Sequence, residues 1–173
     1  MNDHVEISTA LERNVRAVSL RPAVGQGTAV TKVRLESGLT CQVEDGPWRL
    51  TAGMHAKYGG ANAGPNPGVL GRAALGSCLA IGYAMWAARL GVPIDALEVE
   101  IQADYDVRGE LGVADEVSPG YLEVRYLVSI TSPVEEAQVL ALLDQADRYS
   151  SYRDMFVRPV RLVRTVRHER SGV

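Results

Sequence analysis

Two spacings of hydrophobic residues occur along the chain, one typical of helices and one typical of strands. Residues 5–20 carry apolar side chains every three or four positions, and Arg21-Pro22 ends this pattern because proline does not continue a helix. The sequence therefore predicts an N-terminal helical arm over residues 1–24 and a single domain over residues 25–173.

Alternation of apolar and polar residues begins at Thr28 and is typical of strands. Turn-forming residues at 36–38 and 45–47 divide this stretch into a hairpin and a third strand over residues 48–54. Three consecutive short strands favour an antiparallel meander.

A glycine-rich loop and a long apolar helix follow. The loop lacks the spacing of a nucleotide-binding motif, so it is interpreted as a tight turn before the helix. Asn66 is a good N-cap and Pro67 suits a first helical position, which predicts a helix from there to about Leu90. Its uncharged stretch, residues 73–88, is shorter than the roughly 18–20 residues of a membrane span, which favours a buried helix of a soluble protein.

The second half of the chain contains two further strands and a second helix. Alternation over residues 97–105 and 121–130 predicts a pair of strands, the second with Leu122 on its inner face. Ser132 and Glu135 have the spacing of a capping box, which predicts a helix to about Arg148.

The C-terminal part is predicted as a connector over residues 149–156 and a last strand over residues 157–166. The order of all these elements indicates an α+β fold with antiparallel pairing. Small residues form a stripe along the long helix, and part of that apolar surface has no obvious cover in so small a domain, which favours an obligate dimer. The stripe consists of Gly71, Ala74, Cys78 and Gly82.

Composition narrows the class of protein. The 173 residues are 46% hydrophobic and 23% charged with a net charge of −3, so there is no electrostatic case for nucleic acid or an anionic membrane as partner. The polar start has no signal-peptide pattern, which favours a cytoplasmic location. Two cysteines and three scattered histidines make no metal pattern, and no cofactor is predicted.

Cys78, in the middle of the long helix, is the main candidate for chemistry. A buried cysteine either packs as a small hydrophobic residue or reacts as a thiolate beside a cation that lowers its pKa. The candidate cations lie on the strands and loop before the helix: Arg34, Arg49, His55 and Lys57. Cys41 is expected to be a structural or exposed strand thiol. The residues themselves leave both alternatives open for Cys78.

The loop and the helix together resemble a known family. Gly-Gly-Ala-Asn-Ala-Gly-Pro-Asn-Pro at 59–67, followed by Ala-Ala-Leu-Gly-Ser-Cys-Leu at 73–79, is similar to the OsmC/Ohr superfamily of osmotically induced and organic hydroperoxide resistance proteins. The late segment Arg158-Pro159-Val160 also fits the pattern of this family. The resemblance covers roughly residues 28–166. It implies antiparallel sheets wrapped around a long central helix in an interwoven homodimer.

The resemblance also implies thiol-dependent peroxidase chemistry. Cys78 matches the cysteine that attacks an organic hydroperoxide and becomes a sulfenic acid, and Arg34 would help to hold it as a thiolate. A second cysteine normally resolves that acid as a disulfide, but Ser150 occupies its position here. The expected glutamate near the glycine pair is also missing, because Lys57-Tyr58 stands there.

Two functions therefore remain as hypotheses. In one, the protein is a one-cysteine thiol peroxidase in which an external thiol reductant resolves oxidised Cys78. In the other, it is a catalytically degenerate dimer that binds a small apolar ligand.

Overall fold

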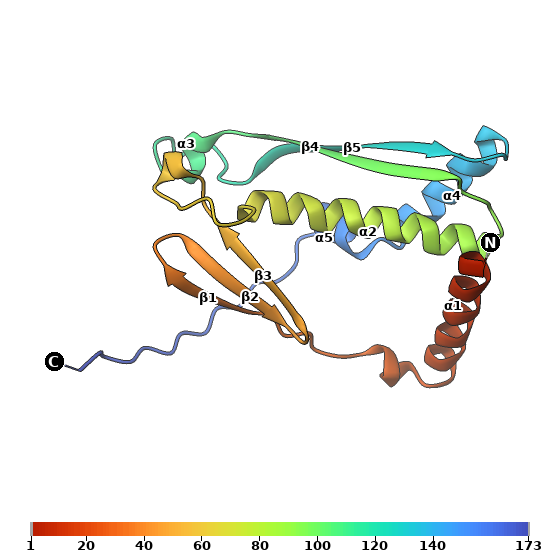
Figure 1. Cartoon of the computed structure of the whole chain (residues 1–173), viewed down its shortest axis with the longest axis horizontal. Helices are drawn as coiled ribbons and strands as arrows, with labels where there is room; N and C mark the ends of the chain where they lie inside the picture. Colours follow the sequence, from red (N-terminus) through yellow and green to blue (C-terminus); the bar gives the residue numbers. More distant parts are fainter. Residues whose placement is uncertain (1, 173) are drawn as a thin grey trace.

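A computed structural model describes residues 2–172 of the chain. The chain has an α+β fold: three consecutive strands precede a long helix, and two further strands precede the last two helices (Figure 1). They are α1 (Asn2–Leu20), η1 (Pro22–Gly25), β1 (Lys32–Ser37), β2 (Thr40–Asp45), β3 (Trp48–Gly53), η2 (Ala56–Tyr58), α2 (Pro67–Leu90), β4 (Ala96–Tyr105), α3 (Val107–Glu110), β5 (Tyr121–Thr131), α4 (Glu136–Arg148) and α5 (Ser151–Val157).

Helix α2 is the central element, and its predicted ends are confirmed. The Asn66 side chain accepts a hydrogen bond from the backbone N–H of Val69 at 2.9 Å, which caps the first turn. Gly91 ends the helix in the left-handed conformation, with a φ of 69°. The loop before the helix folds closely onto β3: a Cβ on Gly60 would lie 2.0 Å from the carbonyl oxygen of Met54. This close approach explains the glycine and supports the interpretation of the loop as a tight turn.

The two-stranded antiparallel sheet β4–β5 covers one face of α2 (Figure 1). Leu75, Leu79 and Tyr83, four residues apart on α2, are buried against it. The helix lies close to the sheet at Gly76, where an added Cβ would be 3.1 Å from the Ile101 side chain. The alternation that predicted these strands is thus confirmed as the packing of one face on the central helix.

Helix α4 extends the same core along the C-terminal half of α2. Leu142 and Ala146 are buried there, Leu142 against Ala87 and Val92. Only one side of α2 is enclosed by the chain, however, and Ile81 on the remaining surface is 61% exposed. The expectation that part of the apolar surface of this helix has no cover within one chain is therefore confirmed.

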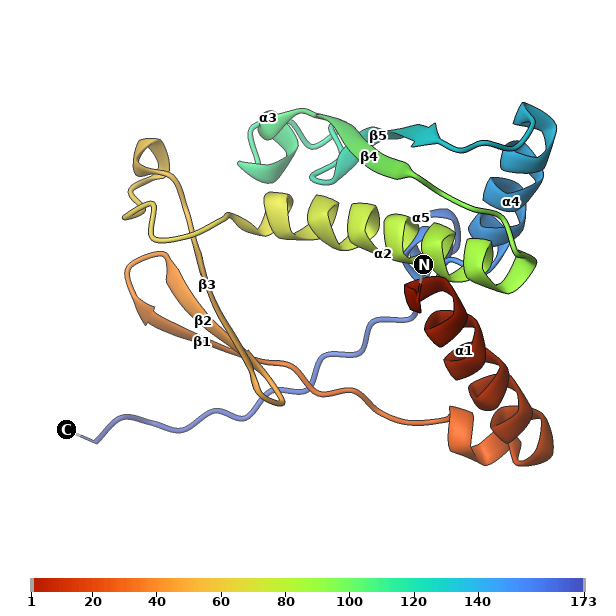
Figure 2. The ribbon, with the colours of Figure 1, turned by 45° about the vertical axis from the view of Figure 1, so that its right-hand side comes forward.

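Strands β1, β2 and β3 form a separate antiparallel meander, as predicted. Figures 1 and 2 show this sheet standing apart from α2 and from β4–β5. Because side chains alternate along a strand, one face of this sheet is polar and the other is apolar. Large side chains on the apolar face remain 62–75% exposed: Val33, Leu35 and Trp48. A single copy of the chain leaves this apolar face without a covering layer.

Three local predictions are wrong for reasons of tertiary contact. Residues 157–166 form no strand, because an extended segment needs a partner strand for its backbone groups, and Leu162 is 94% exposed. The first strand begins at Lys32 rather than at Thr28. The register of β5 shifts near Tyr105, so Tyr121 turns toward α2 and donates to the Gly68 carbonyl, whereas Leu122 is exposed.

The predicted capping box at the start of α4 is also wrong. The helix begins at Glu136, and its N-cap residue Glu135 makes no side-chain capping bond. Ser132 instead donates its hydroxyl hydrogen to the Pro93 carbonyl oxygen at 2.6 Å. This bond ties the turn before α4 to the turn after α2.

The predicted N-terminal helix is present as α1, which packs near the C-terminal end of α2 (Figure 2). The division into an arm over residues 1–24 and a domain over residues 25–173 stays a prediction. By length and composition alone, α2 is able to cross a membrane; the core helix of a soluble protein meets the same criterion.

A matched pair of leucines on α4 tests this core. Leu142 is 1% exposed and Leu140 is 53% exposed. Leu142→Ala is expected to lower the free energy of unfolding by about 2–5 kcal/mol, because it leaves a cavity, whereas Leu140→Ala should change it by roughly 0.5 kcal/mol or less. Chemical denaturation of both variants measures the difference; equal effects would contradict the packing of α4 on α2.

Candidate functional site

Cys78 lies half-buried on α2 and faces the junction between α4 and α5. Its Sγ is 3.6 Å from the Oγ of Ser150 and 3.7 Å from the Oγ of Ser151. The structure therefore brings together two of the three predicted site residues, Cys78 and Ser150, although they are 72 positions apart in the sequence.

The local chain path explains why these serines meet the sulfur. Helix α4 ends at Arg148, and Ser150 caps the next helix by accepting a hydrogen bond from the backbone N–H of Arg153 at 3.4 Å. This sharp turn from α4 into α5 directs the backbone of Ser151 and Tyr152 toward Cys78. Serine is suited to this place because it caps a helix and offers a hydroxyl to a neighbour.

Hydrogen bonds set the acidity of the thiol. Burial raises the pKa of Cys78, but hydrogen bonds from the Tyr152 backbone, from the Ser150 and Ser151 side chains and from the Ser151 backbone outweigh it, so the pKa is lowered from its usual value. Each of these bonds favours the charged form of the sulfur. A larger share of the thiol is therefore ionised at neutral pH than in an unperturbed cysteine.

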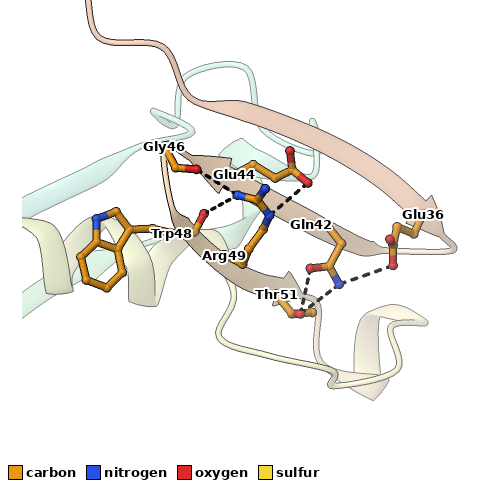
Figure 3. A network of polar contacts seen from close by, with 7 residues as sticks. All are labelled: Glu36, Gln42, Glu44, Gly46, Trp48, Arg49 and Thr51. Carbon is orange, nitrogen blue, oxygen red and sulfur yellow. Dashed lines mark hydrogen bonds and ion pairs between the residues drawn. The ribbon is translucent and has the colours of Figure 1, made fainter.

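The cations considered from the sequence do not act on the thiol within one chain. Arg49 is held in its own hairpin by the carbonyl oxygens of Gly46 and Trp48, at 3.2 and 3.1 Å, and by Glu44 at 3.4 Å (Figure 3). Lys57 lies over the ring of Tyr58, 4.8 Å from its centre. The groups that lower the pKa of Cys78 are the side chains of Ser150 and Ser151 and the backbone of Ser151 and Tyr152, and none of the candidate cations is among them.

Arg34 lies on the polar face of the β1–β3 sheet, opposite Gln42 in the β1–β2 pairing. It is exposed and makes no contact with Cys78 in the described chain. Cys41 lies half-buried on the opposite, apolar face, paired with Leu35 and Ala52. The structure does not bring Arg34 or Cys41 to the serines.

An open pocket of about 490 Å³ begins at Cys78 and follows α2 toward its C-terminal end. Ile81, Met85 and Trp86 give it an apolar wall. Trp86 stacks on Tyr149 with ring centres 5.2 Å apart, and the Arg89 guanidinium lies 4.8 Å from the centre of the Trp86 ring. The pocket therefore suits a small apolar molecule that reaches the thiol. No group of three His, Cys, Asp or Glu side chains suited to a metal ion is present in residues 2–172.

Comparison with known proteins identifies the family. The sequence profile of OsmC-like proteins matches residues 59–163, which include the glycine loop, Cys78 and Ser150. The chain belongs to the OsmC-like family. No curated protein sequence matches it.

Solved structures share the OsmC-like fold. An OsmC-like protein of Mycoplasma pneumoniae superposes with a TM-score of 0.66 at 14% identity, covering 76% of this chain and 89% of that one. An organic hydroperoxide resistance protein OsmC of Legionella pneumophila has a TM-score of 0.57 at 18% identity, covering 75% and 89%. A Vibrio cholerae protein described as an organic hydroperoxide resistance protein, with captopril in one active site, has 0.52 at 17%, covering 78% and 88%. At these identities the likeness shows the fold.

Several residues of this OsmC-like site were not anticipated from the sequence. Ser151 and the Tyr152 backbone contact the thiol, yet only their position directly after Ser150 pointed to them.

The serine contacts predict the pH dependence of Cys78. In a Cys41→Ser background, the rate of alkylation by iodoacetamide should rise through a pH below that of an unperturbed cysteine, because the thiolate is the reactive form. Ser151→Ala should raise the apparent pKa by about one unit, the effect of losing one hydrogen bond to a charged group.

Ser77→Ala is the matched control, since Ser77 adjoins Cys78 but donates to the Ala74 carbonyl. Its alkylation profile should coincide with that of the parent. A Ser151→Ala profile equal to the parent's would contradict a hydrogen-bonded thiolate.

Proposed function

We propose that this OsmC-like protein is a one-cysteine thiol peroxidase that reduces organic hydroperoxides with an external thiol. The observation that carries the proposal is the Cys78 thiol, held by two serine hydroxyls and by backbone groups at an open apolar pocket. Family membership and the names of the Legionella and Vibrio relatives support this class of reaction.

The reaction needs a nucleophilic sulfur and a leaving oxygen. The Cys78 thiolate attacks the outer oxygen of ROOH, the O–O bond breaks, and the departing RO⁻ takes a proton to become an alcohol. Cys78 is then a sulfenic acid, oxidised by two electrons. An external thiol attacks this sulfur, releases water and forms a mixed disulfide with Cys78. A second external thiol attacks the external sulfur of that mixed disulfide, which yields the disulfide of the reductant and restores the Cys78 thiol. Ser150 stands where a resolving cysteine would form an internal disulfide, which a hydroxyl cannot do.

The proposal includes a homodimer, in which a second copy covers the surfaces that one chain leaves open. These are the apolar face of the β1–β3 sheet, with Trp48 75% exposed, and the open side of α2 around Ile81. Residues 158–172 run as an extended segment outside any helix or strand, and their unpaired backbone would be available for strand pairing in such an assembly (Figure 1). We assign thiolate activation by Arg34 to the dimer, because Arg34 does not contact Cys78 in one chain.

A cytoplasmic location fits this chemistry, since external thiols of a reducing compartment would regenerate Cys78. The proposed partners are a second copy, a small hydroperoxide and a thiol reductant, without nucleic acid or a membrane. The pocket favours one alternative: an OsmC-like dimer that has lost catalysis and binds a small apolar ligand. Captopril in the active site of the Vibrio protein shows a small molecule held in that relative.

Trapping of the sulfenic acid separates the two functions. Reduced protein is mixed with cumene hydroperoxide and dimedone, and the intact mass is measured. One adduct per chain is expected, and it should be absent in Cys78→Ser and retained in Cys41→Ser. A thiol that stays unmodified after prolonged exposure would reject the peroxidase and favour the ligand-binding dimer.

Ser150→Cys adds a positive control for the geometry. Because Ser150 lies 3.6 Å from the Cys78 sulfur, this variant is expected to form an intramolecular disulfide between positions 78 and 150 after one equivalent of peroxide. Thiol titration measures the loss of both thiols, and dimedone labelling should fall in parallel.

The assembly is tested by light scattering coupled to size exclusion. The expected mass is twice the 18.7 kDa of one chain, because the exposed apolar faces require a cover. Trp48→Asp should shift the distribution toward monomer, whereas Leu140→Ala, outside these faces, should not. A stable wild-type monomer would contradict the homodimer.

A further inference from the structure

A polar cluster lies in the core on the far side of the α4–α5 turn from Cys78. It consists of Tyr83 on α2, Tyr126 on β5, Asp147 on α4 and Arg153 on α5. Tyr83 is only 1% exposed, so its hydroxyl depends on a partner inside the protein. The proposed catalytic steps use none of these side chains.

Asp147 is the centre of the cluster. Tyr83 donates its hydroxyl hydrogen to Oδ1 at 2.7 Å, and Tyr126 donates to Oδ2 at 2.5 Å. The Arg153 guanidinium donates to the Tyr126 hydroxyl at 3.2 Å and lies 3.7 Å from the same carboxylate oxygen. One carboxylate therefore joins the central helix, the sheet and α5.

The cluster is directly connected to the serines that contact the thiol. The backbone N–H of Ser150 donates to the Asp147 carbonyl at 3.3 Å, and the N–H of Arg153 donates to Ser150 Oγ at 3.4 Å. Tyr83 and Cys78 belong to the same helix, five residues apart. Hydrogen bonds thus connect Tyr83, Asp147 and Ser150, and α2 carries both Tyr83 and Cys78.

We propose that Asp147 is a positioning residue that clamps the α4–α5 turn to α2 and β5 and so holds Ser150 and Ser151 against the Cys78 sulfur. The inference deepens the proposed function, and it rests on Cys78 being its reactive thiol. It does not depend on which oxidant or ligand enters the pocket.

The groups that face Asp147 favour a clamp that stays closed at neutral and mildly alkaline pH. Burial raises the pKa of Tyr83, and its hydrogen bond to Asp147 raises it further; burial also raises the pKa of Tyr126. Both hydroxyls remain donors at neutral and mildly alkaline pH. Arg153 keeps its charge, since its hydrogen bond with Tyr126 raises its pKa, and it balances the carboxylate.

Asp147→Asn tests the clamp with little change of shape. An amide offers one oxygen where the carboxylate offers two, so each tyrosine hydroxyl no longer has an acceptor oxygen of its own, and an NH2 donor faces one of them. In the Cys41→Ser background, the apparent pKa of Cys78, measured by the pH dependence of iodoacetamide alkylation, should rise at least as much as in Ser151→Ala. Asp144→Asn, on an exposed position of the same helix, is the control and should leave the profile unchanged.

Melting temperature is measured in parallel to separate positioning from stability alone. An Asp147→Asn variant that melts earlier but keeps the parent's alkylation profile overturns the inference. If that variant does not fold, Tyr126→Phe removes one of the two hydroxyls, and the same rise in pKa is expected; an unchanged profile overturns the inference. If wild-type protein forms no dimedone adduct yet Asp147→Asn shifts the profile, the peroxidase fails and the clamp stands. If wild-type protein forms the dimedone adduct but Asp147→Asn keeps the parent's alkylation profile, the clamp is rejected and the peroxidase stands.

Discussion

The packing of α2 on the β4–β5 sheet is the interaction on which the rest of the molecule depends. Leu75, Leu79 and Tyr83 repeat every four residues and lose nearly all contact with solvent. Because successive helical residues are rotated by about 100°, this buried row turns Cys78 to the neighbouring side, toward α4 and α5. The same contact that forms the core therefore decides which surface carries the thiol.

The thiol site relies on hydrogen bonds where a cation was anticipated. Desolvation alone would leave Cys78 a poor nucleophile, since burial disfavours the charged sulfur. Two serine hydroxyls and the first amides of α5 reverse that tendency. Ser150 thus has two contacts at once: its hydroxyl lies 3.6 Å from the Cys78 sulfur, and the same hydroxyl caps α5.

The exposed apolar surface of α2 adjoins the thiol site. A chain that wraps only one side of its most apolar helix leaves Ile81 and the β1–β3 face in contact with water, which is unfavourable in proportion to the apolar area. Covering these surfaces with a second copy would also enclose the open pocket beside Cys78. The same interface would then determine how far the apolar surfaces are buried, how a small molecule reaches the thiol, and where Arg34 lies.

Local signals in the sequence were sufficient for much of this fold. Asn66, Pro67 and Gly91 delimit α2, because capping depends on residues within one turn of the helix end. Alternation was enough for β4, whose inner side chains face α2. The resemblance around Cys78 also pointed to Ser150, which the structure places 3.6 Å from the Cys78 sulfur.

Contacts between distant parts of the chain were decided only by the tertiary structure. Ser132 has the spacing of a capping residue but bonds to Pro93, and residues 157–166 have the pattern of a strand but lack a partner in the chain. The acidity of Cys78 and the role of Asp147 likewise depend on side chains from helices and a strand that only packing brings together. Backbone preference acts over a few residues, whereas hydrogen bonds to a buried group depend on every element that surrounds it.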